Sequence, residues 1–102
     1  MSGTDLHSYE LIYVLQPDVD NNTITDVQNR LTQAIAGQQG EVKATEVWGK
    51  RTLAYPIQKH VTGYYVLHRF DMNPSGTEEL ERLLRFNENV IRYLIVRDED
   101  EE

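Results

Sequence analysis

The chain has 102 residues, a mass of 11.9 kDa, 39% hydrophobic and 26% charged residues, and a formal net charge of −7. This size and composition predict one compact domain and exclude a disordered or collagen-like chain. Because cysteine is absent, a disulfide framework, a thiolate metal site and a cysteine nucleophile are excluded. No apolar run reaches the roughly 20 residues that span a bilayer. The N-terminus does not read as a signal peptide, so we expect a soluble, cytoplasmic protein with no membrane contact.

The first predicted elements are a strand and a helix. Residues 8–15 combine aromatic and β-branched side chains and are apolar on both faces, which is typical of a central strand. Residues 21–23 then offer N-cap oxygens, and apolar residues recur at helical spacing over 24–35. We expect Gly37 and Gly40 to end this helix.

The next segment predicts a strand near the edge of the sheet. Residues 41–48 alternate in polarity, which places Val42, Ala44 and Trp48 on one face. Gly49 then allows a bulge or a turn.

Residues 50–62 predict an irregular strand end followed by a loop. Pro56 cannot donate to a sheet ladder, so it favours an edge or bulge position. Residues 64–70 follow as a second aromatic strand that is apolar on both faces, and therefore as a second central strand.

The last two elements are a helix and a strand. Ser75 and Glu78 match a capping box, and leucines over residues 80–84 form the buried stripe of a helix. Asn87 suits a left-handed helix terminator, and residues 89–97 predict a strand by composition and length.

The resulting order, β-α-β-β-α-β, predicts an α+β ferredoxin-like fold. Its four-stranded antiparallel sheet has the order 4-1-3-2 with both helices on one face. The face without helices should expose Tyr and Leu from the central strands, which suggests a covering partner. We divide the chain into a flexible extension (1–7), the folded domain (8–97) and a disordered acidic tail (98–102).

The charge is unevenly distributed along the chain. Residues 1–47 carry a net charge of −5 and residues 98–102 another −5, whereas residues 48–97 carry +3. A basic face for nucleic acid is therefore possible despite the acidic total, although an ordinary mixed surface explains the composition more readily.

The sequence lacks the groups that catalysis needs. Acylphosphatases share the predicted topology but cradle phosphate in a glycine-rich loop with an essential Arg, whereas residues 16–22 are acidic and contain neither residue type. His7, His60 and His68 lack metal-ligand spacing, and no nucleophile pairs with a base. We therefore expect no enzyme activity, cofactor, metal or small-molecule substrate.

RNA binding has more physical support. Aromatic and basic residues alternate in the last two strands and offer stacking surfaces and phosphate contacts; they are Tyr64, Tyr65, Arg69, Arg92, Tyr93 and Arg97. RNA-recognition motifs share the predicted topology, but residues 63–70 do not match their strand-three pattern. An independent single-stranded RNA-binding module therefore remains an alternative, as does an effector-binding or dimerising module.

Several segments together resemble one known family. They are Ser-Tyr-Glu at 8–10, Trp-Gly-Lys-Arg-Thr-Leu-Ala-Tyr-Pro-Ile-Gln-Lys at 48–59, Gly-Tyr-Tyr at 63–65, Arg-Phe-Asn-Glu-Asn-Val-Ile-Arg at 85–92 and Ile-Val-Arg at 95–97. Across residues 7–97 the chain resembles the S-six family of bacterial small-subunit ribosomal proteins. The resemblance implies a structural ribosomal protein that binds the central domain of small-subunit ribosomal RNA as a heterodimer with protein S-eighteen.

If the chain functions as the resemblance implies, two sets of residues make its contacts. The expected RNA contacts are Lys50, Arg51, Lys59, Arg85, Arg92 and Arg97, whose cations can bind phosphate oxygens. The expected contacts with the protein partner are Trp48, Leu53, Tyr55, Pro56 and Ile57. Two alternatives stay open: each base could instead form a surface ion pair, and Leu53 and Ile57 could pack onto the chain's own core.

Overall fold

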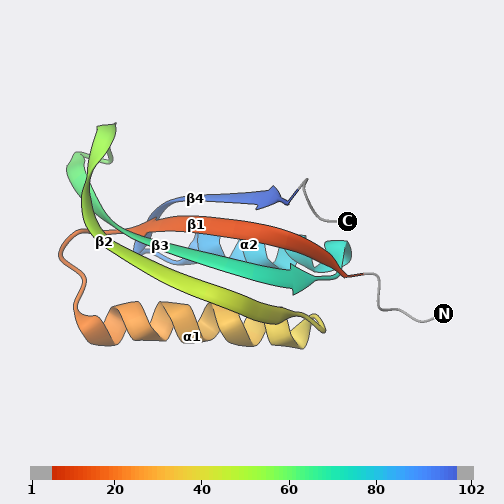
Figure 1. Ribbon diagram of the computed structural model, residues 1–102. Helices are drawn as coiled ribbons and strands as arrows, with labels where there is room; N and C mark the ends of the chain where they lie inside the picture. The colour runs from red at the N-terminus through yellow and green to blue at the C-terminus, as the bar shows by residue number, and fades with distance from the viewer. Residues whose placement is uncertain (1–5, 99–102) are drawn as a thin grey trace.

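The computed structural model describes residues 6–98 as a four-stranded antiparallel sheet with two helices against one face (Figure 1). The elements are β1 His7–Leu15, α1 Asn21–Gly37, β2 Glu41–Ile57, β3 His60–Met72, a 3₁₀ turn Pro74–Gly76, α2 Thr77–Phe86 and β4 Val90–Arg97. The strand order β2-β3-β1-β4 is the predicted order read from the other edge, with β1 and β3 in the centre. The prediction of an α+β ferredoxin-like fold is confirmed.

The ends of the domain differ slightly from the predicted boundaries. β1 begins at His7, which the sequence placed in the extension. The backbone N–H of Asp98, placed in the tail, donates a 2.9 Å hydrogen bond to the carbonyl of Ser8. The rest of the predicted extension and tail, residues 1–5 and 99–102, lies outside the described residues.

The main core lies between the sheet and the helices. It consists of alternate β1 side chains, the apolar stripes of both helices and inward-facing β3 residues, including Tyr9, Leu11, Tyr13, Leu15, Ile24, Val27, Leu31, Ile35, Val66, Phe70, Leu80 and Leu84. Full burial of an apolar side chain of this size stabilises the fold by about 1.5–3 kcal/mol. The periodicities of two and 3.6 residues therefore locate the core correctly.

The predicted face pattern of β2 is wrong at its start. Val42 pairs with Phe70, a core residue, whereas Ala44 pairs with Arg69 on the other side of the sheet. A register shift between the two β2 residues inserts one extra residue, so they face opposite ways. A second shift occurs at Gly49, whose φ of 80° confirms the predicted bulge.

The predicted loop within residues 50–62 is a β-hairpin instead. β2 continues to Ile57, β3 starts at His60, and Gln58 and Lys59 form the turn with φ of 50° and 73°. Two-residue turns with positive φ match the twist of paired strands, but they usually contain Gly or Asn, so the sequence carries no turn signal here. Figure 1 shows this end of the hairpin rising away from the helix layer.

The position predicted for Pro56 is confirmed. It lies in β2, an edge strand, within a register shift between Thr52 and Ile57 that leaves residues 53–56 outside the ladder with β3. The missing N–H of proline therefore costs the sheet no ladder hydrogen bond.

The N-cap of α1 lies one residue before the predicted range of 21–23. Asp20 is the N-cap, and its carboxylate accepts a 2.8 Å hydrogen bond from the Thr23 backbone N–H. Hydrogen bonds from the side chain and then the backbone of Thr23 lower the pKa of Asp20. At the other end, the helix finishes at Gly37 as predicted, and the Gly40 N–H donates to the Ile35 carbonyl at 2.9 Å, while the residue with left-handed φ is Gln39, at 64°.

The predicted caps of α2 are also wrong. A 3₁₀ turn precedes the helix, the N-cap is Gly76 without a side-chain hydrogen bond, and the side chain of Asn73 instead accepts from Ser75. The capping box with Glu78 therefore does not form. Asn87 ends the helix with φ of −86°, which is an extended and not a left-handed conformation.

Candidate RNA and protein interface

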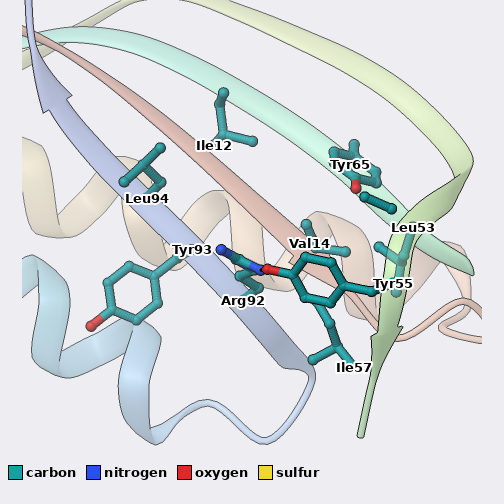
Figure 2. Close-up of a pocket in the computed structure, with 10 residues that line it drawn as sticks. Ile12, Val14, Leu53, Tyr55, Ile57, Tyr65, Arg92, Tyr93 and Leu94 are labelled. Carbon is teal, nitrogen blue, oxygen red and sulfur yellow. The ribbon is translucent and has the colours of Figure 1, made fainter. Parts of the chain in front are cut away.

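The sheet face that no helix covers, here called the helix-free face, carries an apolar groove of about 300 Å³ between the end of β2 and β4 (Figure 2). Val14 and Leu53 line it and belong, with Ile91, to a second small core cluster whose three members are all buried. Its walls include Tyr55 and Leu94, which are 54% and 57% exposed. Apolar side chains are therefore exposed on this face, but these two lie on β2 and β4, the edge strands, and not on the central strands where the prediction placed them.

Among the described strand residues, the most exposed apolar side chain is Val61, beside the hairpin turn at the start of β3, and the other exposed ones come from the edge strands. Tyr65 of β3 is half-buried and Leu67 of the same strand is buried, whereas Leu94 and Val96 of β4 are exposed. β4 lies at the edge of the sheet, where fewer neighbouring side chains cover it.

The structure divides the predicted partner contacts into buried and accessible ones. Leu53 is buried and Ile57 partly buried against the chain's own small cluster, as the alternative for these two residues anticipated. Tyr55 and Pro56, in the same segment, are exposed. Leu53 and Ile57 therefore shape the groove, and Tyr55 and Pro56 are free to contact a partner.

Trp48 lies farther along β2 and completes an aromatic pair. Its ring stacks on Tyr65, with centroids 6.2 Å apart and planes inclined by 18°, and its Nε1 donates to Glu46 at 3.0 Å. The Arg51 guanidinium lies 5.1 Å from the centroid of the Trp48 ring. A cation thus adjoins the aromatic pair, a combination that suits stacking and phosphate contact.

Arg92 and Tyr55 connect the groove to the predicted RNA contacts. Arg92 pairs with Val14 in the sheet and so lies on the helix-free face, where its guanidinium is 5.5 Å from the centroid of the Tyr55 ring. Its Nη1 also donates a hydrogen bond to the Tyr55 hydroxyl, which raises the pKa of Arg92. Figure 2 shows the two side chains meeting across the groove, although β2 and β4 are not neighbours in the sheet.

The basic residues fall into two groups by their ion pairs. Arg30, Lys43 and Arg82, which the sequence did not assign to RNA, pair with carboxylates. Arg69, which the sequence offered as a phosphate contact in the last two strands, also pairs with a carboxylate, that of Glu10 at 2.9 Å. Within residues 6–98, no carboxylate lies within 4 Å of the nitrogens of Lys50, Arg51, Lys59 or Arg92. The ion-pair alternative therefore does not apply to these four bases among the described residues.

The two other predicted RNA contacts are placed differently. Arg85 forms an ion pair with Glu81 at 3.6 Å, as its alternative anticipated. It nevertheless lines a hollow of about 330 Å³ together with Arg92 and Gln58, the neighbour of Lys59 in the hairpin turn. Arg97 lies at the opposite end of β4 and contacts His7, away from this cluster.

A polar cluster around a buried histidine was not predicted. His68 is 1% exposed, and its ring nitrogens lie 3.0 Å from the Tyr13 hydroxyl and 2.9 Å from the Thr45 hydroxyl. Burial lowers the pKa of His68 to about 4, so the ring is neutral at pH 7. The sequence offers no signal for this cluster, since its three residues lie on different strands.

Residues 6–98 contain no group of three His, Asp or Glu side chains that could hold a metal ion. None of the helices there is long and apolar enough to cross a membrane.

Comparison with known proteins gives one consistent family. The family model for ribosomal protein S6 matches residues 8–97. Small ribosomal subunit protein bS6 of Moorella thermoacetica is 42% identical over 96 residues, which cover 94% of this chain and 98% of that protein. The bS6 protein of Caldanaerobacter subterraneus subsp. tengcongensis is 44% identical over 95 residues, 93% and 100% of the two chains.

Solved structures agree. The crystal structure of 30S ribosomal protein S6 from Thermotoga maritima superposes with a TM-score of 0.88 at 26% identity and covers 94% of this chain and 91% of that one. The C-terminal domain of MgtC from Mycobacterium tuberculosis, at 13% identity and a TM-score of 0.66, shares the fold alone. The chain therefore belongs to the ribosomal protein S6 family, the S-six family that its sequence resembles, and is a structural component of the small ribosomal subunit and not an enzyme.

Proposed function

We propose that this protein binds the central domain of small-subunit ribosomal RNA as a heterodimer with protein S-eighteen. One observation carries the proposal: Arg51 and Arg92, which have no ion-pair partner within residues 6–98, adjoin an uncovered apolar groove on the same face. Such bases are available for phosphate, and such a groove is available for a protein. The juxtaposition supports a composite RNA and protein surface.

The charge of the chain favours binding with a partner. At a net charge of −7, the protein as a whole repels RNA at long range, although the cations of Arg51 and Arg92 lie on its helix-free face. A basic protein seated in the groove would supply positive charge and cover Tyr55 and Leu94. The heterodimer should therefore bind RNA more tightly than this chain alone.

The test measures affinity for a central-domain RNA fragment with and without protein S-eighteen, at two salt concentrations. We expect partner-dependent binding that weakens with salt, because phosphate contacts release counterions. Arg51→Gln, Lys59→Gln and Arg92→Gln should each weaken binding and lower the slope of log K against log salt by about one. Arg30→Gln is the matched control, because Arg30 is held by Asp26 on α1 at 2.9 Å.

Two results would contradict the proposal. If Arg30→Gln weakened binding as much as Arg92→Gln, only the overall charge would matter and not this face. If the partner made no difference and unstructured RNA bound equally well, the chain would act as an independent single-stranded RNA binder. The aromatic pair of Trp48 and Tyr65 would then be the next target for substitution.

A further inference from the structure

Tyr55 contributes to the groove and also contacts the Arg92 guanidinium. Its ring forms part of the groove wall, and its hydroxyl accepts a hydrogen bond from Arg92. We propose that Tyr55 is a positioning residue that aims Arg92 at an RNA phosphate, so that docking of a protein in the groove raises the affinity for RNA. This inference rests on the function proposed above and concerns how its two binding events are coupled.

The geometry leaves Arg92 able to bind phosphate while Tyr55 holds it. The hydrogen bond uses Nη1 alone, and no described residue accepts a hydrogen bond from Nε or Nη2 of this side chain. These two nitrogens form the edge of a guanidinium that pairs with two oxygens of one phosphate. Tyr55 therefore orients the cation without occupying the donors that RNA needs.

The position of Tyr55 depends on what fills the groove. It lies in the segment 53–56, outside the ladder between β2 and β3, and its side chain is 54% exposed. In the free protein the burial of Leu53 and the contact of Tyr55 with Arg92 restrain this segment. A partner packed against the exposed side of Tyr55 would immobilise the side chains of Tyr55 and Arg92. RNA binding would then no longer include the entropy loss of ordering them, so its affinity would rise.

The test uses Tyr55→Phe, which keeps the ring in the groove wall and removes only the hydroxyl. With protein S-eighteen at a saturating concentration, we expect a roughly fivefold smaller enhancement of RNA affinity by that partner than in wild type. Tyr64→Phe is the control, because Tyr64 loses the same group on the helix-covered side of β3. It should leave the enhancement unchanged.

A double variant distinguishes positioning from a general structural effect. If Tyr55 acts through Arg92, then Tyr55→Phe should add no further loss to Arg92→Gln. In the free proteins, NMR of the arginine side chains should show slower rotation of the Arg92 guanidinium in wild type than in Tyr55→Phe. Additive losses, or equal rotation rates, would overturn the positioning role while leaving the proposed function intact. If the wild-type pair showed no partner-dependent RNA binding, the proposed function would fail, and this inference with it.

Discussion

The buried imidazole of His68 should make the stability of this protein sensitive to mild acid. The ring lies between the hydroxyls of Tyr13 and Thr45, stacks on the Tyr13 ring with centroids 5.4 Å apart, and faces no carboxylate in its hydrogen bonds. Protonation would place a positive charge in this enclosed position. The fold can avoid that cost only by keeping the ring neutral.

The size and sign of the effect follow from the pKa. Burial lowers the pKa of His68 from 6.5 to about 4, so the unfolded chain takes up the proton first as the pH falls. The stability that the neutral His68 ring contributes is fully present above pH 6.5 and decreases as the pH falls towards 4. Below pH 4 this contribution changes no further. Since one pKa unit corresponds to 1.36 kcal/mol, the free energy of unfolding should fall by about 2 kcal/mol by pH 5 and by about 3 kcal/mol in total.

Urea unfolding followed by tryptophan fluorescence or circular dichroism, at intervals between pH 7.5 and 4.5, measures this dependence. His68→Gln retains a polar side chain that can bond to both hydroxyls but cannot titrate, so its curve should be nearly flat above pH 5. His60→Gln, at the half-buried start of β3, is the control and should keep the acid sensitivity of wild type. An equal slope in His68→Gln and wild type would refute the reasoning.

Two further predictions concern local structure, and both are checked by the free energy of unfolding at neutral pH. Asp20→Ala should cost about 1 kcal/mol because it removes the N-cap of α1, while Asn22→Ala should cost almost nothing; equal losses would contradict the assigned cap. Gly40→Ala should cost about 1–3 kcal/mol, because a Cβ there would lie 2.4 Å from the backbone oxygen of Asp71. A Cβ at Gly37 would have no atom within 4 Å, so Gly37→Ala should stabilise α1 by up to about 1 kcal/mol. A loss of stability as large as that of Gly40→Ala would rule out the steric explanation.

The sequence alone determined the order of elements, the fold class and the family. Two-faced apolar strands at 8–15 and 64–70 marked the centre of the sheet, and the stripes from Ile24 to Ile35 and from Leu80 to Leu84 marked the faces that the helices bury. These patterns repeat within a few residues, because secondary structure imposes its own period on burial. Local reading therefore suffices for them.

Only the tertiary structure decided how distant residues meet. The Gln58 and Lys59 turn forms without typical turn residues because β2 and β3 pair on either side of it, and the bulge after Val42 reverses the faces expected from alternation. Arg92 contacts Tyr55 across 37 positions of sequence, and Tyr13 contacts His68 across 55. The pairing of bases with carboxylates and the lining of the groove likewise depend on contacts between strands that are distant in sequence. The local hydrophobic pattern of the sequence contains no information about such contacts.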